Sequence, residues 1–213
     1  MVHHTYRLWS LSIKIPSMRR QAAFAERLAN LRYSKRHSEQ TRRSIIDAAA
    51  IKFRENGFSG VGVDAIASQA QVTTGAIYNQ FQSKDRLFAE VVEEGLQRLV
   101  AGLEHIKEEG SEDWVAQFAS YYLSKNHVAS VGIGCCLPTL SFDVARADEQ
   151  SKLVFTEGLE KVVGVISEEH GTPQKAMLII ASLLGSVVLA RATGNGKLRD
   201  DLLQEILNSL DPR

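Results

Sequence analysis

Apolar residues recur at helical spacing in almost every patterned segment of this chain. Side chains three and four positions apart share one face of an α-helix, and this period recurs throughout the 213 residues. Strand-like alternation occurs only in residues 11–15, which are too few and too isolated to form a sheet. The pattern therefore predicts an all-α protein.

Capping residues mark where these helices are expected to begin and end. Ser38 is a plausible N-cap for a helix that runs to about Asn56 and stops at Gly57. Ser83 is expected to cap a later helix that continues through Leu99, and Thr172 caps another, with Pro173 in its first turn. Further helices are predicted at about 63–70, 112–126, 142–169 and 198–210, with a glycine-containing connector over 128–140.

The stretch VTTGAIYNQF, residues 72–81, predicts a short helix with two different faces. With Thr73 as N-cap, Val72 and Ile77 are spaced as a hydrophobic staple that fixes how the chain enters the helix. Ile77 and Phe81 then share the inward face. This side of the helix is expected to hold it to the rest of the protein.

The outward face of the same helix carries small or hydrogen-bonding groups. Gly75 and Asn79 point away from the apolar side, while Thr74 and Tyr78 lie on its flank. Such a surface suits a helix that enters a DNA major groove, although close packing against another helix would also explain the glycine. Together with helix 63–70 and a three-residue turn, it predicts a helix-turn-helix, a pattern that is weakly specific by spacing alone.

The net charge of zero hides a strong asymmetry along the chain. Residues 1–44 contain ten Lys and Arg against two Asp and Glu, a net charge of +8, whereas residues 91–213 carry −7. A basic N-terminal arm before an acidic body indicates contact with a polyanion, but a solvated, disordered tail has the same composition.

The adjacent cysteines, Cys135 and Cys136, cannot join distant segments, so a secreted disulfide framework is not expected. No Lys or Arg lies within five residues of them, which favours a plain buried role over redox sensing. The most apolar stretch, residues 176–192, has the length of a buried helix and is interrupted by Gly185 and Arg191. With no signal peptide, a cytoplasmic protein is expected.

Five segments, in order and at fixed distances, resemble the DNA-binding domain of the TetR family of bacterial transcriptional regulators. Residues 185–192 are also similar to the dimer-forming region of many such proteins. The resemblance implies an all-helical homodimer, in which an N-terminal three-helix helix-turn-helix head precedes a larger C-terminal helical ligand-binding and dimerisation domain. The five segments are 45–53, 57–58, 63–67, 72–81 and 83–87.

Domain boundaries and partners follow from the same resemblance. It implies a DNA-binding domain over 38–83 and an effector-binding and dimerisation domain over 84–213 that dimerises through about 173–210. The charge pattern adds a basic, partly disordered arm over residues 1–37, which is longer than the family usually shows. The implied partners are double-stranded DNA with a palindromic operator, an unknown small-molecule effector and a second copy of the chain, with no membrane. The residues implied to contact DNA are Arg42, Arg43, Thr73, Thr74, Gly75, Tyr78, Asn79 and Lys84.

Two positions depart from the family pattern. Gln71 stands where the turn usually has glycine, so a positive φ there would strain the backbone by roughly 1 kcal/mol. Gly62 stands where a Ser or Thr hydroxyl usually caps the second helix, so a phosphate contact there would have to come from a backbone N–H.

Aromatic and methionine residues in the body are candidates for an effector pocket, although such residues more often belong to a core. No cofactor is expected, and no His, Cys, Asp and Glu cluster has the spacing of a metal site. The candidate pocket residues are Trp114, Phe118, Tyr121, Tyr122, Phe142, Phe155 and Met177.

The sequence thus predicts a DNA-binding transcriptional regulator, a repressor that a small-molecule effector releases from its operator. An enzyme is not expected, because no nucleophile elbow, phosphate loop or metal motif occurs. The alternative is a helical partner-binding or membrane-surface protein that uses the basic arm around Phe24 and Leu28.

Overall fold

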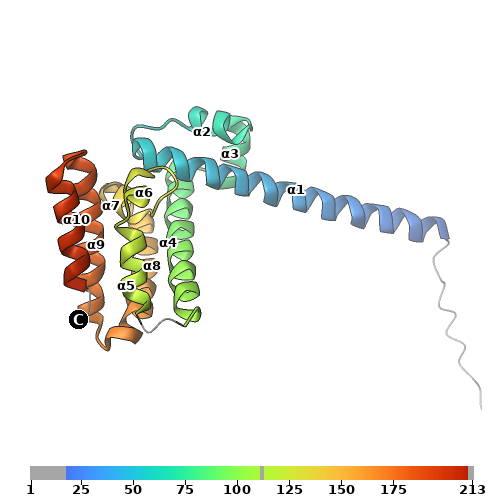
Figure 1. Ribbon diagram of the computed structural model, residues 1–213. Coiled ribbons are helices and arrows are strands. Elements are labelled where there is room, and N and C mark those ends of the chain that lie inside the picture. The colour runs from blue at the N-terminus through green and yellow to red at the C-terminus, as the bar shows by residue number, and fades with distance from the viewer. Residues whose placement is uncertain (1–17, 111–112, 211–213) are drawn as a thin grey trace, which may run out of the picture. The chain divides into compact units, whose positions relative to one another are not determined.

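The computed structural model describes residues 18–110 and 113–210 (Figure 1). This part of the chain is helical and contains no strand, which confirms the all-α prediction. It comprises two units, one ending at Thr41 and one beginning at Arg42, and each is described by itself. The helices are α1 (Met18–Asn56), α2 (Val63–Ala70), α3 (Thr74–Phe81), α4 (Lys84–Glu108), α5 (Trp114–Tyr122), α6 (Lys125–Ala129), α7 (Leu137–Arg146), α8 (Glu149–His170), α9 (Pro173–Thr193) and α10 (Lys197–Leu210).

The first helix begins much earlier than its predicted cap. Ser38 lies inside α1, so the expected start at this residue was wrong. The 39 residues of α1 include neither glycine nor proline, and nothing in their sequence obliges the backbone to leave the helix before Gly57, where φ is +74°. The expected disorder of the arm concerns residues 1–17, which lie outside the described residues, whereas residues 18–37 are helical.

The caps predicted for the next helices are confirmed. The Thr73 hydroxyl accepts a hydrogen bond from the N–H of Ala76 at 3.2 Å and begins α3. The Ser83 hydroxyl accepts one from the N–H of Arg86 at 3.1 Å and begins α4. Each hydroxyl satisfies an N–H group that has no partner within its own helix.

Two helices predicted as continuous are broken by local caps. The helix expected over 112–126 ends at Tyr122, because Ser124 starts α6 by accepting a hydrogen bond from the N–H of His127. The helix expected over 142–169 is two, since the Asp148 carboxylate accepts from the N–H of Ser151 at 2.8 Å and starts α8. Pro138 lies in the first turn of α7, so the connector is shorter than predicted.

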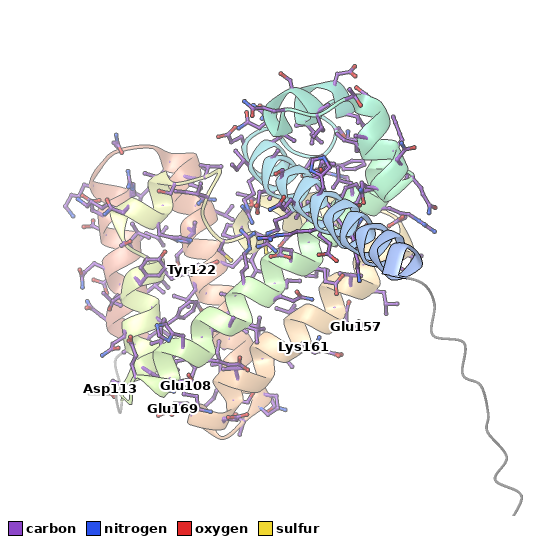
Figure 2. All side chains as sticks on the ribbon, turned by 90° about the vertical axis from the view of Figure 1, so that its right-hand side faces the viewer. Glu108, Asp113, Tyr122, Glu157, Lys161 and Glu169 are labelled. Atoms are coloured by element: carbon purple, nitrogen blue, oxygen red, sulfur yellow. The ribbon has the colours of Figure 1, made fainter. Side chains whose placement is uncertain are left out.

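The second unit is built on helices packed side by side. Helix α4 packs against α8, α8 against α9, and α9 against α10 (Figure 1). At the α4–α8 contact, a Cβ on Gly158 would lie 2.5 Å from Leu96 Cδ1, so a larger residue would push the helices apart. At the far end of α8, Glu169, labelled in Figure 2, accepts a hydrogen bond from Trp114 Nε1 of α5 at 3.0 Å.

Helix α9 is unusually apolar. In the described part of the chain it is the one helix long and apolar enough to cross a membrane, judged by length and composition only. An 18-residue stretch of it has a mean hydropathy of 1.9, yet only 33% of that stretch is buried. A large apolar surface of α9 is therefore left uncovered by this single chain.

Candidate nucleic-acid interface and ligand pocket

Helix α3 is divided between a buried face and an open face. Ile77 and Phe81 are 1% and 2% exposed, and both belong to the core. Tyr78 is 48% exposed, and Gly75 and Asn79 are exposed as well. The helical spacing predicted this division correctly, and it leaves a phenol, an amide and bare backbone facing outward.

The N-terminal end of α3 has room for a close approach. A Cβ added to Gly75 would meet only Thr73 Oγ1, at 3.9 Å. Close packing against another described helix therefore does not account for this glycine. The Thr74 hydroxyl donates to Asp64 Oδ1 of α2 at 2.8 Å, which ties the two helices of the helix-turn-helix together.

The two departures from the family pattern take the expected geometry. Gln71 has φ +56° and ψ +42°, so this non-glycine residue adopts the left-handed conformation. Gly62 is the N-cap of α2 without a side-chain hydrogen bond, and a Cβ there would have nothing within 4 Å.

Arg42 of α1 holds the end of α3 in place. Its guanidinium lies 4.4 Å from the centre of the Phe81 ring, and Nη1 donates to the Gln80 carbonyl oxygen at 3.1 Å. Nη2 pairs with Glu90 of α4. Arg42 was predicted to contact a DNA phosphate, but these contacts engage much of its charge within the protein. No local sequence signal reveals them, because the partners lie far along the chain.

Arg43 and Lys84 are also engaged within the protein. Arg43 pairs with Glu94 at 2.9 Å and with Asp47 at 3.5 Å. Lys84 Nζ lies 4.2 Å from the centre of the Phe58 ring. Phosphate contacts by these residues stay a prediction.

A cavity of ≈ 310 Å³ is lined by residues of α1, α4, α5, α6 and the connector before α7. Of the seven predicted pocket residues it brings together Phe118, Tyr121 and Tyr122. The other four do not line it: Trp114 is buried in the core, Phe155 is partly buried against the core, and Phe142 and Met177 are exposed on the surface. Helical spacing correctly placed all seven predicted residues in helices, but it does not show which helix faces meet around a common cavity.

The polar groups of this cavity come from separate helices. Arg54 Nη1 donates to the Gly132 carbonyl oxygen at 3.2 Å, while Nε is buried without a partner among the described residues. Burial lowers the pKa of Arg54, and no described carboxylate forms an ion pair with it. The Tyr122 hydroxyl is likewise buried, beside the Cys135 thiol, and burial raises the pKa of this phenol. The cavity therefore offers the unsatisfied Nε–H of Arg54 beside aromatic rings.

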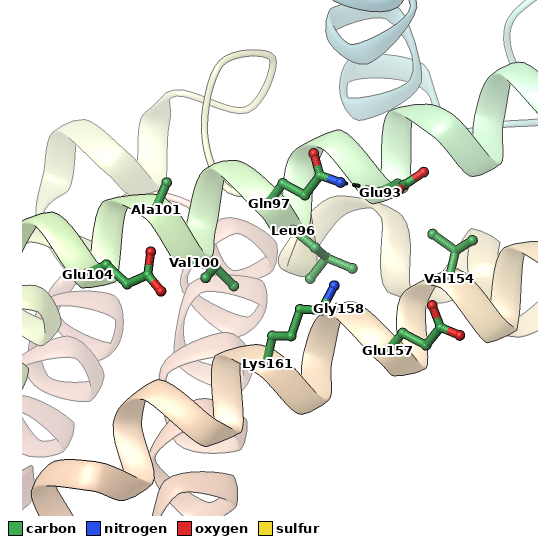
Figure 3. A pocket seen from close by; sticks show the side chains of 10 residues that line it. All are labelled: Glu93, Leu96, Gln97, Val100, Ala101, Glu104, Val154, Glu157, Gly158 and Lys161. Atoms are coloured by element: carbon green, nitrogen blue, oxygen red, sulfur yellow. Dashed lines mark hydrogen bonds between the residues drawn. The ribbon is translucent and has the colours of Figure 1, made fainter.

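A second, smaller hollow of ≈ 160 Å³ lies between α4 and α8 (Figure 3). Glu93 and Glu104 border it from α4, and Glu157 and Lys161 border it from α8. None of the predicted pocket residues lines this hollow. Its border is mainly acidic, whereas the ≈ 310 Å³ cavity is lined by Arg54 and aromatic side chains.

Residues 45–91, which include the divided helix α3, match the family model described as bacterial regulatory proteins, tetR family. The chain belongs to the TetR family. It is therefore a DNA-binding transcriptional regulator, as the sequence predicted.

Known proteins resemble the TetR-family chain over both its head and its body. The HTH-type transcriptional repressor SCO4008 of Streptomyces coelicolor is 24% identical over 160 residues, 72% of this chain and 82% of that protein. The regulator AcrR of Shigella flexneri is 40% identical over 62 residues, 29% of each chain. The crystal structure of reduced E. coli NemR covers 80% of this chain and 94% of its own, with a TM-score of 0.70 and 21% identity. The agreement in fold extends well beyond the head.

Proposed function

We propose that this TetR-family protein is a cytoplasmic, homodimeric repressor that a small-molecule effector releases from a palindromic operator. The observation that carries the proposal is helix α3, which is capped by Thr73, buries Ile77 and Phe81, and exposes Tyr78 and Asn79. This is the arrangement of a recognition helix that enters a major groove. SCO4008 and E. coli NemR are both named HTH-type transcriptional repressors, which supports repression over activation.

The proposed DNA contacts divide into two kinds. Thr73, Thr74, Gly75, Tyr78 and Asn79 face the operator, with the side chains of Tyr78 and Asn79 best exposed to reach it. A second set of groups contacts phosphates: the Tyr78 side chain, the backbone N–H groups at the start of α2 and several cationic side chains. The cationic members of this second set are Arg42, Arg43 and Lys84.

Domain boundaries follow the same division. The head spans residues 38–83, the body spans 84–213, and the arm spans 1–37, of which 18–37 extend the first helix. We propose that the arginines of the arm add phosphate or minor-groove contacts. Deleting residues 1–34 should then weaken binding and reduce its salt dependence, and an unchanged affinity and salt slope would refute this role.

A second copy of the chain is the proposed cover for α9 and α10, over residues 173–210. Exposed apolar side chains gather there: Leu178 is 68% exposed, Leu189 is 52% exposed, and Leu198 of α10 is 69% exposed. Burying such side chains gives about 25 cal/mol per Å² of apolar area. Dimerisation through these helices would also set the distance between the two heads.

The effector is proposed to bind in the ≈ 310 Å³ cavity. Phe118, Tyr121 and Tyr122 would contact an apolar or aromatic body, while Arg54 would bind a carbonyl or anionic group. Because Arg54 belongs to α1, a ligand there contacts the first helix of the head directly. Release from DNA then requires a higher effector affinity for the conformation that does not fit the operator.

The test is binding of the purified full-length chain to fragments of the genome that encodes it, followed by anisotropy measurements on the selected sequence. Tyr78→Ala should weaken binding roughly 5- to 150-fold, which corresponds to about 1–3 kcal/mol for a lost base contact. Arg86→Ala, which removes an exposed charge from α4, is the control and should change affinity little. Failure to enrich any fragment, with the fold intact, would contradict the proposal.

A further inference from the structure

Cys135 and Cys136 lie where the DNA-binding head meets the body. Both line the ≈ 310 Å³ cavity, Cys135 as a partly buried residue and Cys136 as a buried residue at the start of α7. A Cβ on Gly95 of α4 would lie 2.8 Å from Cys136 Sγ, so α4 packs directly on this thiol. Cys136 therefore packs against α4, and both cysteines border the cavity.

Several groups converge on the Cys135 sulfur. The backbone N–H of Leu137 donates to Sγ at 3.4 Å, and the thiol of Cys136 adjoins it in sequence. The Tyr122 hydroxyl, 97% of whose residue surface is buried, lies beside it without an oxygen or nitrogen partner among the described residues. A buried hydroxyl that donates to a neighbouring thiolate stabilises the negative charge there.

These contacts make Cys135 the more acidic thiol. The hydrogen bond from Cys136, followed by those from Tyr122 and Leu137 and by the charge of Arg54, lowers the pKa of Cys135 to about 7 despite burial. The hydrogen bond to Cys135 and burial raise the pKa of Cys136. The expectation of plain buried cysteines rested on the absence of a nearby cation in sequence, but Arg54 supplies one from α1.

His127 holds the Cys135 backbone in position and does not act as a base for the thiol. Its Nδ1 donates to the Tyr122 carbonyl oxygen at 2.7 Å, and its Nε2 accepts from the N–H of Cys135 at 3.2 Å. This pattern requires the neutral ring with the proton on Nδ1, and burial lowers the pKa of His127 in the same sense.

We propose that Cys135 and Cys136 form an oxidisable pair that a hydroperoxide entering the cavity converts into a disulfide. The argument rests on two adjacent thiols that both line the cavity, with the N–H of Leu137 donating to Cys135 Sγ at 3.4 Å. A nucleophilic thiolate next to a resolving thiol is the usual arrangement of a peroxide-sensing cysteine.

The chemistry proceeds in two balanced steps. The Cys135 thiolate attacks the distal oxygen of the hydroperoxide, an S–O bond forms, the O–O bond breaks, and an alkoxide leaves and takes a proton from water. Cys136 then attacks the sulfenic sulfur, an S–S bond forms, and the departing hydroxide leaves as water with the Cys136 proton. The two thiols lose two electrons and two protons, and the peroxide gains both and is reduced to an alcohol and water.

Oxidation would disturb the contacts between head and body. A disulfide brings two sulfurs to about 2.05 Å, so Cys136 Sγ must move from the position against which Gly95 packs. The same loop carries Gly132, whose carbonyl accepts the hydrogen bond from Arg54 of α1. The expected consequence, weaker operator binding, rests on the proposed function, whereas the thiol chemistry does not.

The first experiment treats the reduced full-length protein with one equivalent of hydrogen peroxide. We expect an intact mass lower by two hydrogens, loss of both titratable thiols within one chain, and full recovery with a dithiol reductant. Cys136→Ser should stop at a sulfenic acid that dimedone traps at Cys135. Cys135→Ser should react with hydrogen peroxide more slowly than the wild-type protein and more slowly than Cys136→Ser. No internal disulfide at peroxide levels that oxidise Cys136→Ser, or a disulfide between two chains instead, would overturn the proposal.

A parallel arm with N-ethylmaleimide separates oxidation from alkylation. Rapid modification of Cys135 together with inertness toward peroxide would identify an electrophile site and overturn the oxidisable pair. The second readout is operator affinity, expected to fall roughly 5- to 150-fold on oxidation, the usual range of allosteric coupling, and to be restored by reduction. Unchanged affinity of the oxidised protein would overturn the regulatory link. If the reduced protein itself binds no DNA, the proposed function fails, while the mass result still decides the thiol chemistry.

Discussion

Arg54 donates a hydrogen bond from Nη1 to the carbonyl oxygen of Gly132, 3.2 Å away. This contact joins the first helix of the DNA-binding head to the loop that precedes α7. A second link lies nearby, where the N–H of Phe58 donates to Asp143 Oδ2 of α7 at 3.1 Å. The cysteine pair and the ≈ 310 Å³ cavity lie in the same region, so a change in the cavity is adjacent to a contact with the head.

Gly95→Ala should destabilise the protein and disturb this junction. Its Cβ would lie 2.8 Å from Cys136 Sγ and 2.9 Å from Cys136 Cβ, so α4 or α7 must shift. Overpacking of this kind typically costs about 1–3 kcal/mol. Gly102→Ala on the same helix is the matched control, since its Cβ meets nothing within 4 Å and should stabilise α4 by up to about 1 kcal/mol. Urea unfolding measures both, and equal effects would contradict the close contact.

Gln71→Gly should stabilise the head, because Gln71 occupies the left-handed region at φ +56°. Glycine adopts this conformation without steric cost, so a gain of roughly 0.5–1 kcal/mol is expected after its larger unfolded-state entropy is counted. Gln69→Gly, at an exposed position within α2, should instead destabilise by about the same amount. Thermal unfolding of the two variants should shift in opposite directions.

Arg42→Ala should lower the free energy of unfolding by about 1–2 kcal/mol, in addition to any effect on DNA binding. The guanidinium packs on the Phe81 ring and hydrogen-bonds to the end of α3, and those contacts are lost without DNA. Arg43→Ala is the control, because its exposed ion pairs are worth at most about 1 kcal/mol. If Arg42→Ala unfolds like the wild type but binds DNA weakly, Arg42 acts only as a phosphate contact.

Leu189→Glu should convert a dimer to a monomer. Leu189 is 52% exposed on α9, and a charge there would be buried without a partner in the proposed dimer. Leu153→Glu places the same charge at a similarly exposed position of α8 and should leave the assembly unchanged. Sedimentation velocity distinguishes the outcomes, and a dimer that survives Leu189→Glu would place the interface elsewhere.

The rate of Cys135 alkylation by iodoacetamide should rise with pH around a midpoint of about 7, because only the thiolate reacts and the pKa of Cys135 is lowered to about 7. Cys136→Ala removes the hydrogen bond that lowers this pKa most, so the midpoint should move toward higher pH. Tyr122, His127 and Arg54 also face the site, and Tyr122→Phe should shift the midpoint in the same direction but less. A midpoint near that of a free thiol in the wild type would contradict the assigned contacts.

Much of the DNA-binding head could be predicted from the sequence, because its determinants are local. Thr73 and Ser83 cap the helices that directly follow them, and the positions of Ile77, Tyr78 and Asn79 on α3 depend only on the helical repeat. The helix start predicted at Ser38 was wrong, because a serine within an uninterrupted run of helix-forming residues need not act as an N-cap. The same ambiguity hid the caps at Ser124 and Asp148.

Only the tertiary structure decided which distant residues meet. Arg42 lies against Phe81 and Glu90, and Arg54 lies near the cysteines, because helices from separate parts of the chain pack together. The periodicity of one helix says which side is buried but not which partner covers it. For that reason the sequence by itself determined the all-α class, the family and the buried and exposed faces of α3, but not every helix boundary. Packing determined the cavity, the contacts of Arg42 with the end of α3 and the groups that surround Cys135.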